Sequence, residues 1–174
     1  NLTINVADNA ANPVVQIASI GTDIGTVTVS QSSGVVVTGT TSAATVAITD
    51  TRDGQTVAFQ DAVTIGTLTT AAQGYNIALN TGASGQTSSI TNAVTFNNTG
   101  TLTLGNDVAD SITFTGGVSK TVGTKSLAGT ISTSNADINF GTAGNITLAG
   151  NTTISSGSGN ITLYDIPGPA NVNL

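Results

Sequence analysis

The residues that this 174-residue chain lacks exclude most catalytic chemistry. It contains no cysteine, histidine, glutamate, methionine or tryptophan. Without cysteine there are no disulfides, no zinc–thiolate sites and no thiol nucleophile. Without histidine a Ser-His-Asp triad cannot be built. The acid–base groups that remain are nine aspartates. We therefore predict a protein that is not an enzyme and needs no cofactor.

Positive charge is almost as scarce. The only cations are Arg52, Lys120 and Lys125, and the net charge is −6. A nucleic-acid-binding surface needs a basic stripe, and an anionic membrane also attracts basic residues. No apolar run approaches the roughly 20 residues of a membrane helix. We expect no nucleic-acid partner and no membrane insertion, and we expect both lysines to carry charge on a loop. The chain starts without a basic and apolar leader, which suggests a mature product or an excised segment.

The residues that are abundant favour strands. Charged residues make up 7 % of the chain, against about 25 % in ordinary soluble domains, and Thr, Ser, Asn and Gly fill the polar positions. A mean hydropathy of +0.23 argues for a collapsed chain, because disordered chains combine low hydrophobicity with high net charge. Thr and Val suit a pleated surface because they branch at Cβ. The composition predicts an all-β fold.

Apolar and small polar residues alternate with a period of two, which is the signature of short half-buried strands. Gly-Asn pairs, which turn the chain tightly, occur at Gly105, Gly144, Gly150 and Gly159. A turn followed by the same kind of strand, many times over, indicates a repeat architecture. The predicted strands contain 26–29, 46–48, 57–59, 77–79, 94–96, 102–104, 112–114, 138–140, 146–148 and 161–163.

Four of these strands end in phenylalanine. Phe59, Phe96, Phe114 and Phe140 each follow an apolar residue two positions earlier, and residues i and i+2 face the same side of a strand. We predict that these four rings form part of the core and that at least two of them stack on adjacent rungs. Their spacing suggests coils of roughly 17–26 residues.

The favoured architecture is a parallel β-solenoid, or β-helix, in a single domain spanning residues 1–174. The alternative is a β-sandwich or jelly roll, which normally shows longer strands and charged outer faces. Ladders of Thr and Asn instead suit coils stacked in register. Residues 1–25 are less regular, and 166–174 form an exit segment in which Val172 and Leu174 resume the alternation.

Two stretches strengthen this interpretation. Ser126–Leu163 reads SLAGTISTSNADINFGTAGNITLAGNTTISSGSGNITL, and Thr101–Val118 reads TLTLGNDVADSITFTGGV. In composition and cadence, residues 93–164 resemble the β-strand repeats of large bacterial exoproteins, the filamentous-haemagglutinin-like and autotransporter-like surface adhesins. That resemblance implies an exported protein with a long right-handed β-helix that serves as a stalk, adhesin or matrix fibre. It carries no functional residue over to this chain.

Paired aspartates are the remaining candidates for chemistry. Asp50 and Asp53 flank Arg52, and Asp107 and Asp110 share another loop. Two carboxylates can cleave a glycosidic bond, and carboxylate and amide oxygens can bind Ca²⁺, for which Asp107 and Asp110 beside Asn106 are the better pair. The alternative is a purely structural role, because aspartate stabilises turns and is common in loops. We expect this structural role, and no required metal.

Three functions remain open. The first is a non-enzymatic structural module of an extracellular or cell-surface adhesin or filament, which stacks end to end with further repeats or copies, or polymerises by strand complementation. Asn1–Val6 alternates from its first residue with no capping helix ahead of it, as an open end requires. The second is an adhesin domain that binds surface glycans or a receptor. The third is a polysaccharide-processing β-helix enzyme.

Overall fold

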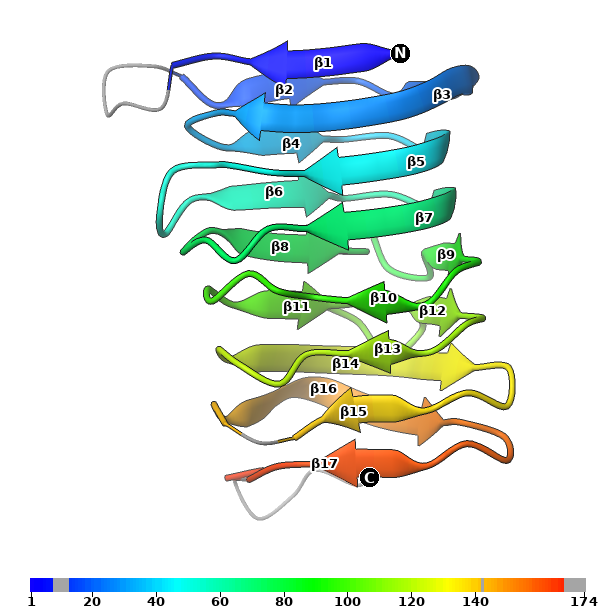
Figure 1. The fold of residues 1–174 in the computed structure, drawn as a ribbon. Helices are drawn as coiled ribbons and strands as arrows, with labels where there is room; N and C mark the ends of the chain where they lie inside the picture. Colours follow the sequence, from blue (N-terminus) through cyan, green and yellow to red (C-terminus); the bar gives the residue numbers. More distant parts are fainter. Residues whose placement is uncertain (8–12, 142, 168–174) are drawn as a thin grey trace.

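The protein is a parallel β-solenoid of about seven turns, and the part of the chain that the structure describes is built from strands with no helix. The computed structural model describes residues 1–7, 13–141 and 143–167. Figure 1 shows the coils stacked from the N-terminal end at the top to the C-terminal end at the bottom. In-register neighbours are 20 to 25 residues apart from Val15 to Ile146, within the expected repeat length. At about 4.8 Å per rung, seven turns make a rod about 30 Å long.

Each coil contributes strands to three faces, and every strand pair is parallel. On the first face lie β2 (Val15–Ile17), β4 (Val35–Val37), β6 (Thr56–Phe59), β8 (Asn76–Leu79), β11 (Leu102–Leu104) and the first parts of β14 (Lys125–Thr133) and β16 (Ile146–Ser155). On the second face lie the first parts of β3 (Ile20–Gln31), β5 (Thr41–Ile48) and β7 (Val63–Thr70), then β9 (Thr87–Ile90), β12 (Ser111–Phe114) and the last parts of β14 and β16. On the third face lie β1 (Leu2–Asn5), the last parts of β3, β5 and β7, then β10 (Val94–Thr95), β13 (Val118–Ser119), β15 (Ile138–Phe140) and β17 (Ile161–Leu163).

The alternation of the sequence decides which side chains enter the core. On the first face Val35, Val57, Ile77 and Leu102 follow one another in register, and each is at most 1 % exposed. The residue that follows each of them along its own strand, such as Ala58 after Val57 or Thr103 after Leu102, points outward because successive side chains of a strand alternate. In-register aliphatic columns of this kind fill the interior along the whole rod.

Long strands bend around a corner and belong to two faces. Residues 146–148 of β16 pair on the first face and residues 152–155 on the second. Gly150, expected to mark a tight turn, lies inside this strand at the bend. At Gly105 and Gly144 the expected turns do occur, with positive φ angles of 73° and 77°. Glycine avoids the Cβ clash that this backbone region imposes on other residues.

The four phenylalanines are buried, with exposed fractions of at most 2 %, but they do not form one ladder. Phe59 lies on the first face, Phe114 on the second, and Phe140 on the third, and Phe96 directly follows the third-face strand β10. Phe96 and Phe114 meet edge to face, with ring centroids 6.1 Å apart and planes at 87°. Apolar-x-Phe therefore places a ring in the core, but it recurs on different faces.

The N-terminal segment forms strands, whereas the described part of the exit segment does not. Residues 1–25, expected to be less regular, supply β1, β2 and the beginning of β3. Of the exit segment, Ile166 and Pro167 follow β17 without regular structure. Val172 and Leu174 lie outside the described residues.

Candidate functional site

Asp107 and Asp110, the candidate metal ligands, act as caps for backbone amides. Asp110 is 1 % exposed. One of its carboxylate oxygens accepts hydrogen bonds from the amides of Asn106 and Asp107, at 3.0 Å each, and the other accepts from the amide of Gln86 at 2.9 Å. Asp107 Oδ1 accepts from the amide of Ala109 at 2.9 Å. The pair is thus engaged in holding the turn between β11 and β12.

In the second aspartate pair, Asp53 also accepts a backbone hydrogen bond. Asp53 Oδ1 accepts a hydrogen bond from the amide of Gly74, on the next coil, at 2.9 Å. Across residues 1–7, 13–141 and 143–167, no group of three or more His, Cys, Asp or Glu side chains is placed to hold a metal ion.

The described part of the chain contains no helix that is long and apolar enough to span a membrane.

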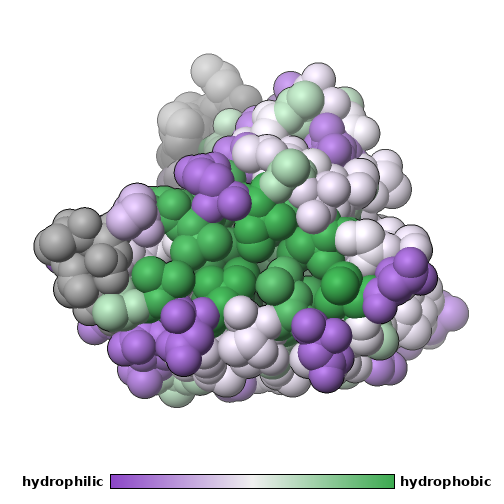
Figure 2. Space-filling view, turned by 90° about the horizontal axis from the view of Figure 1, so that it is seen from above, coloured by the Kyte–Doolittle hydropathy of each residue, from purple (hydrophilic) through white to green (hydrophobic). Residues whose placement is uncertain are grey.

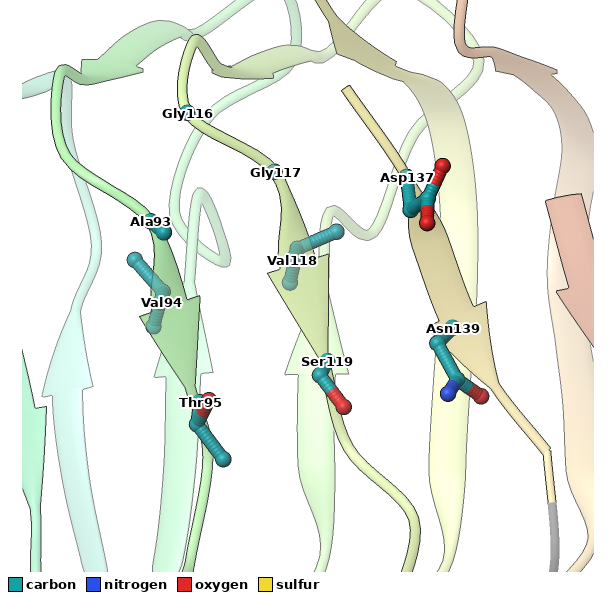
Figure 3. Close-up of a pocket in the computed structure, with 9 residues that line it drawn as sticks. All are labelled: Ala93, Val94, Thr95, Gly116, Gly117, Val118, Ser119, Asp137 and Asn139. Atoms are coloured by element: carbon teal, nitrogen blue, oxygen red, sulfur yellow. The ribbon is translucent and has the colours of Figure 1, made fainter. Parts of the chain in front are cut away.

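A shallow depression of about 380 Å³ crosses the third face over β10, β13 and β15. Figure 3 shows Thr95, Ser119 and Asn139 in a row along it, as their parallel register requires. Gly116 and Gly117 have no side chains to fill the hollow, and Asp137 is the single carboxylate among the lining residues. Glycoside cleavage normally needs two carboxylates, whereas this surface offers hydroxyl and amide groups for hydrogen bonding.

A column of buried polar side chains runs along the corner between the third and first faces. We call it the polar corner: Ser32, Thr51, Tyr75, Asn98, Lys120 and Lys125, each 0 % exposed. The hydroxyls of Ser32 and Thr51 lie 2.8 Å apart. The Tyr75 hydroxyl donates to the carbonyl of Ile48 at 2.9 Å, and Asn98 Nδ2 donates to the carbonyl of Tyr75 at 3.0 Å. Neighbouring coils thus satisfy each other's polar groups.

The expectation that both lysines carry charge on a loop is wrong. Lys120 extends the third-face alternation by one residue, and its amide donates to the carbonyl of Asn139 at 2.8 Å. Its side chain therefore points inward at the level of Phe96 on one side and Phe140 on the other. Its Nζ donates to the backbone carbonyl of Asn98, and it lies 3.2 Å from Asn98 Oδ1.

Lys125 enters the core from the first face, in register between Leu102 and Ile146. Its Nζ donates to the carbonyl of Ala143 at 2.6 Å. Burial lowers the pKa of Lys125, and burial together with the positive charge of Lys125 lowers the pKa of Lys120 to about 8. Low polarizability around a buried amine disfavours its charged form.

Sequence reasoning had a usable signal for Lys120. Val118-Ser119-Lys120 follows the same inward–outward alternation as two triplets on the neighbouring coils, Val94-Thr95-Phe96 and Ile138-Asn139-Phe140. The third residue of each triplet therefore points inward. Lysine is usually exposed because it is charged, so its presence at an inward position was not expected.

The N-terminal end of the rod leaves its core uncovered over the described residues. Seen from that end, hydrophobic side chains form a central patch ringed by polar ones (Figure 2). Leu2, Val15, Ile17 and Ile24 are only partly buried there. At the opposite end, Ile161 is 44 % exposed although its in-register neighbour Ile138 is 0 % exposed.

Comparison with known proteins gives no relative: no family model, curated protein or solved structure matches this chain.

Proposed function

We propose that this chain is a non-enzymatic structural module, a rod segment of an extracellular surface adhesin or filament that stacks end to end with further coils or copies. The observation that carries the proposal is the open N-terminal rung. Among the described strands β1 pairs only with β3 and β2 only with β4, so both strands are sheet edges. An edge that lies beside an exposed apolar patch is a template for another strand.

The sides of the rod support the same role. Ser42, Thr64, Ser89, Thr113, Ser132 and Ser155 follow one another in register on the outward side of the second face. The hydroxyls of Thr113 and Ser132 lie 3.1 Å apart. A hydroxyl ladder hydrates the side of the rod with little charge, so the apolar N-terminal end is the surface most prone to association. The resemblance of residues 93–164 to adhesin repeats supports an extracellular setting.

The unpaired edge can be assigned atom by atom at β2. The amide of Val15 donates to the carbonyl of Gly34, and the carbonyl of Ile17 accepts from the amide of Thr38, each at 2.9 Å. Alternate residues of a parallel strand bond to the same neighbour. The backbone N–H and C=O of Gln16 therefore face the open side, where an added strand would bond.

The experiment compares the wild-type chain with Gln16→Pro by sedimentation velocity over a wide range of concentration. Proline removes the open-side N–H but none of the β2–β4 hydrogen bonds. We expect the wild type to form growing linear assemblies and Gln16→Pro to remain smaller at the same concentration. Gln16→Thr, which keeps the donor, is the matched control and should assemble like the wild type.

Circular dichroism of each variant checks that the strand content and melting temperature are retained. A wild-type chain that stays monomeric at its highest soluble concentration contradicts the proposal. So does a folded Gln16→Pro variant that assembles as readily as Gln16→Thr.

The depression on the third face favours a second candidate, a glycan-binding adhesin domain. Thr95, Ser119 and Asn139 present hydroxyl and amide groups at regular spacing along it. A glycan array probed with the wild type and with Asn139→Ala tests this candidate. Ser126→Ala, on the outward side of the first face, is the control. Binding that Asn139→Ala abolishes and Ser126→Ala retains supports a glycan site; no binding to any glycan argues against it.

A further inference from the structure

Two side chains of the polar corner combine burial with reactive functional groups. Lys120 and Asn98 are both 0 % exposed and lie on successive coils. We propose that Lys120 and Asn98 are a covalent modification site, at which Lys120 Nζ becomes joined to Asn98 Cγ in an intramolecular isopeptide bond. This inference rests on the interior of the rod and does not depend on the proposed function.

The geometry brings the amine to the amide carbonyl. Lys120 Nζ is 3.2 Å from Asn98 Oδ1. Because Oδ1 is bonded to Cγ, this contact holds the amine beside the atom that it must attack, and such positioning favours reaction. Asn98 Nδ2 donates to the carbonyl of Tyr75 at 3.0 Å. That hydrogen bond turns Nδ2 away from the lysine and presents the oxygen side of the amide to it.

The buried surroundings of Lys120 favour a neutral amine, which can react, over a charged ammonium ion. Phe96 and Phe140 lie in register on either side of Lys120, and both are at most 1 % exposed. The causes that shift the pKa of Lys120 are burial and the charge of Lys125, and both lower it. A buried ammonium ion without an anionic partner is unfavourable, and an amide carries no charge.

The step balances without an added reagent. The neutral Lys120 amine attacks Asn98 Cγ, and a new N–C bond forms. The Cγ–Nδ2 bond then breaks, and the proton lost by the attacking nitrogen leaves with Nδ2 as ammonia. One amide replaces another, with no oxidation or reduction. The product ties two neighbouring coils together covalently in a chain that has no cysteine.

Intact-mass measurement of the denatured full chain is the first test, after incubation of the folded protein at about pH 9, above the pKa of Lys120. We expect a mass lower than the sequence mass by one ammonia. Trypsin supplies the second readout, because it cleaves after Arg52, Lys120 and Lys125 but not after an acylated lysine. The peptide Thr121–Lys125 should therefore be absent, and residues 53–125 should remain one fragment.

Matched variants locate the bond. Lys120→Arg keeps a cation whose guanidinium does not attack an amide, so it should show the full sequence mass. Lys125→Arg alters the other buried cation, whose Nζ donates to the backbone carbonyl of Ala143, so the loss of ammonia should persist. Wild-type protein at the full sequence mass that releases Thr121–Lys125 overturns the proposal. Loss of ammonia with release of that peptide also overturns it, because it indicates a cyclised asparagine elsewhere.

Discussion

Among the described residues, one buried side-chain polar atom lacks a hydrogen-bond partner, the hydroxyl of Thr41. Thr41 is 1 % exposed and lies in register between Ile20 and Val63. The aliphatic character of these neighbours on both coils explains why the hydroxyl finds no acceptor. A buried polar group without a partner lowers stability by about 1–3 kcal/mol.

We therefore expect Thr41→Val to raise the free energy of unfolding by about 1–2 kcal/mol, because it replaces the hydroxyl with a methyl group of similar size. Thr133→Val is the matched control, since the Thr133 hydroxyl donates to the carbonyl of Ala136. It should lower stability. Denaturant unfolding of both variants measures the difference, and a Thr41→Val variant less stable than the wild type contradicts the assignment.

Tyr75 makes stability depend on pH. Burial is the largest cause that raises its pKa from 10.0 to about 12. The folded state holds this proton more tightly than the unfolded state, so the contribution of Tyr75 is complete below pH 10 and is lost as the pH rises through about 12. The free energy of unfolding should fall over this window by up to about 1.4 kcal/mol per pH unit.

Tyr75→Phe provides the comparison, because it removes the titrating group and the hydrogen bond to Ile48. It should be less stable than the wild type at neutral pH, and the gap should narrow above pH 10. Lys120 and Lys125, whose pKa values burial lowers, change stability with pH in the opposite direction, but both are present in both proteins. Parallel pH profiles for the two proteins would contradict a raised Tyr75 pKa.

Among the elements, the turn between β11 and β12 depends on Asp110. The carboxylate accepts three backbone hydrogen bonds. We expect Asp110→Ala to lower the free energy of unfolding by about 2–4 kcal/mol, because three partly buried backbone amides lose their acceptor. Asp107→Ala, which removes one acceptor contact, should cost about 1 kcal/mol or less. Thermal unfolding with and without chelator should superimpose; a fall in melting temperature that Ca²⁺ reverses would show a metal site.

The sequence predicts those strands whose inward positions are aliphatic or aromatic. Leu102–Leu104, Ile138–Phe140 and Ile161–Leu163 are β11, β15 and β17 with unchanged bounds. The strands of the second face are harder to predict, because polar residues occupy some of their inward positions. In β9, Thr87–Ile90, the inward Ser88 is buried, donates to Asn80 Oδ1 at 2.5 Å and accepts from the amide of Val63 at 2.8 Å. Local alternation cannot reveal such a partner, because it comes from another coil or from across a turn.

The candidate sites were predicted less well than the strands, for a related reason. The loop positions of Asp107 and Asp110 are evident from sequence, but their carboxylates bind backbone amides that become neighbours only after folding. The polar corner depends on side chains whose partners lie 18 to 27 residues away, such as the Ser32 and Thr51 hydroxyls or the Tyr75 hydroxyl and the Ile48 carbonyl. Spacing along the chain identifies such pairs only when the length of each coil is known, and coil length varies with the loops.

For the whole molecule, the rod is a one-dimensional stack in which each coil contacts mainly its neighbours. Stability in such a stack is close to a sum of coil and interface terms, so coils with one neighbour open more readily than coils with two. β8 pairs with both β6 and β11, whereas β2 pairs with β4 alone among the described strands. The uncovered apolar patch of Figure 2 adds to this difference, because the first rung buries one side only.

Amide hydrogen exchange of the wild type at two protein concentrations tests this. In dilute solution the amides of β1 and β2 should exchange much faster than those of β8 and β11, because the end rung opens locally. At high concentration a stacked coil should protect β1 and β2 selectively and leave the central strands unchanged. Gln16→Pro should remove the concentration dependence while keeping fast exchange at the end. Equal protection of β2 and β8 in dilute solution would contradict an open end, and end protection that concentration does not change would contradict end-to-end stacking.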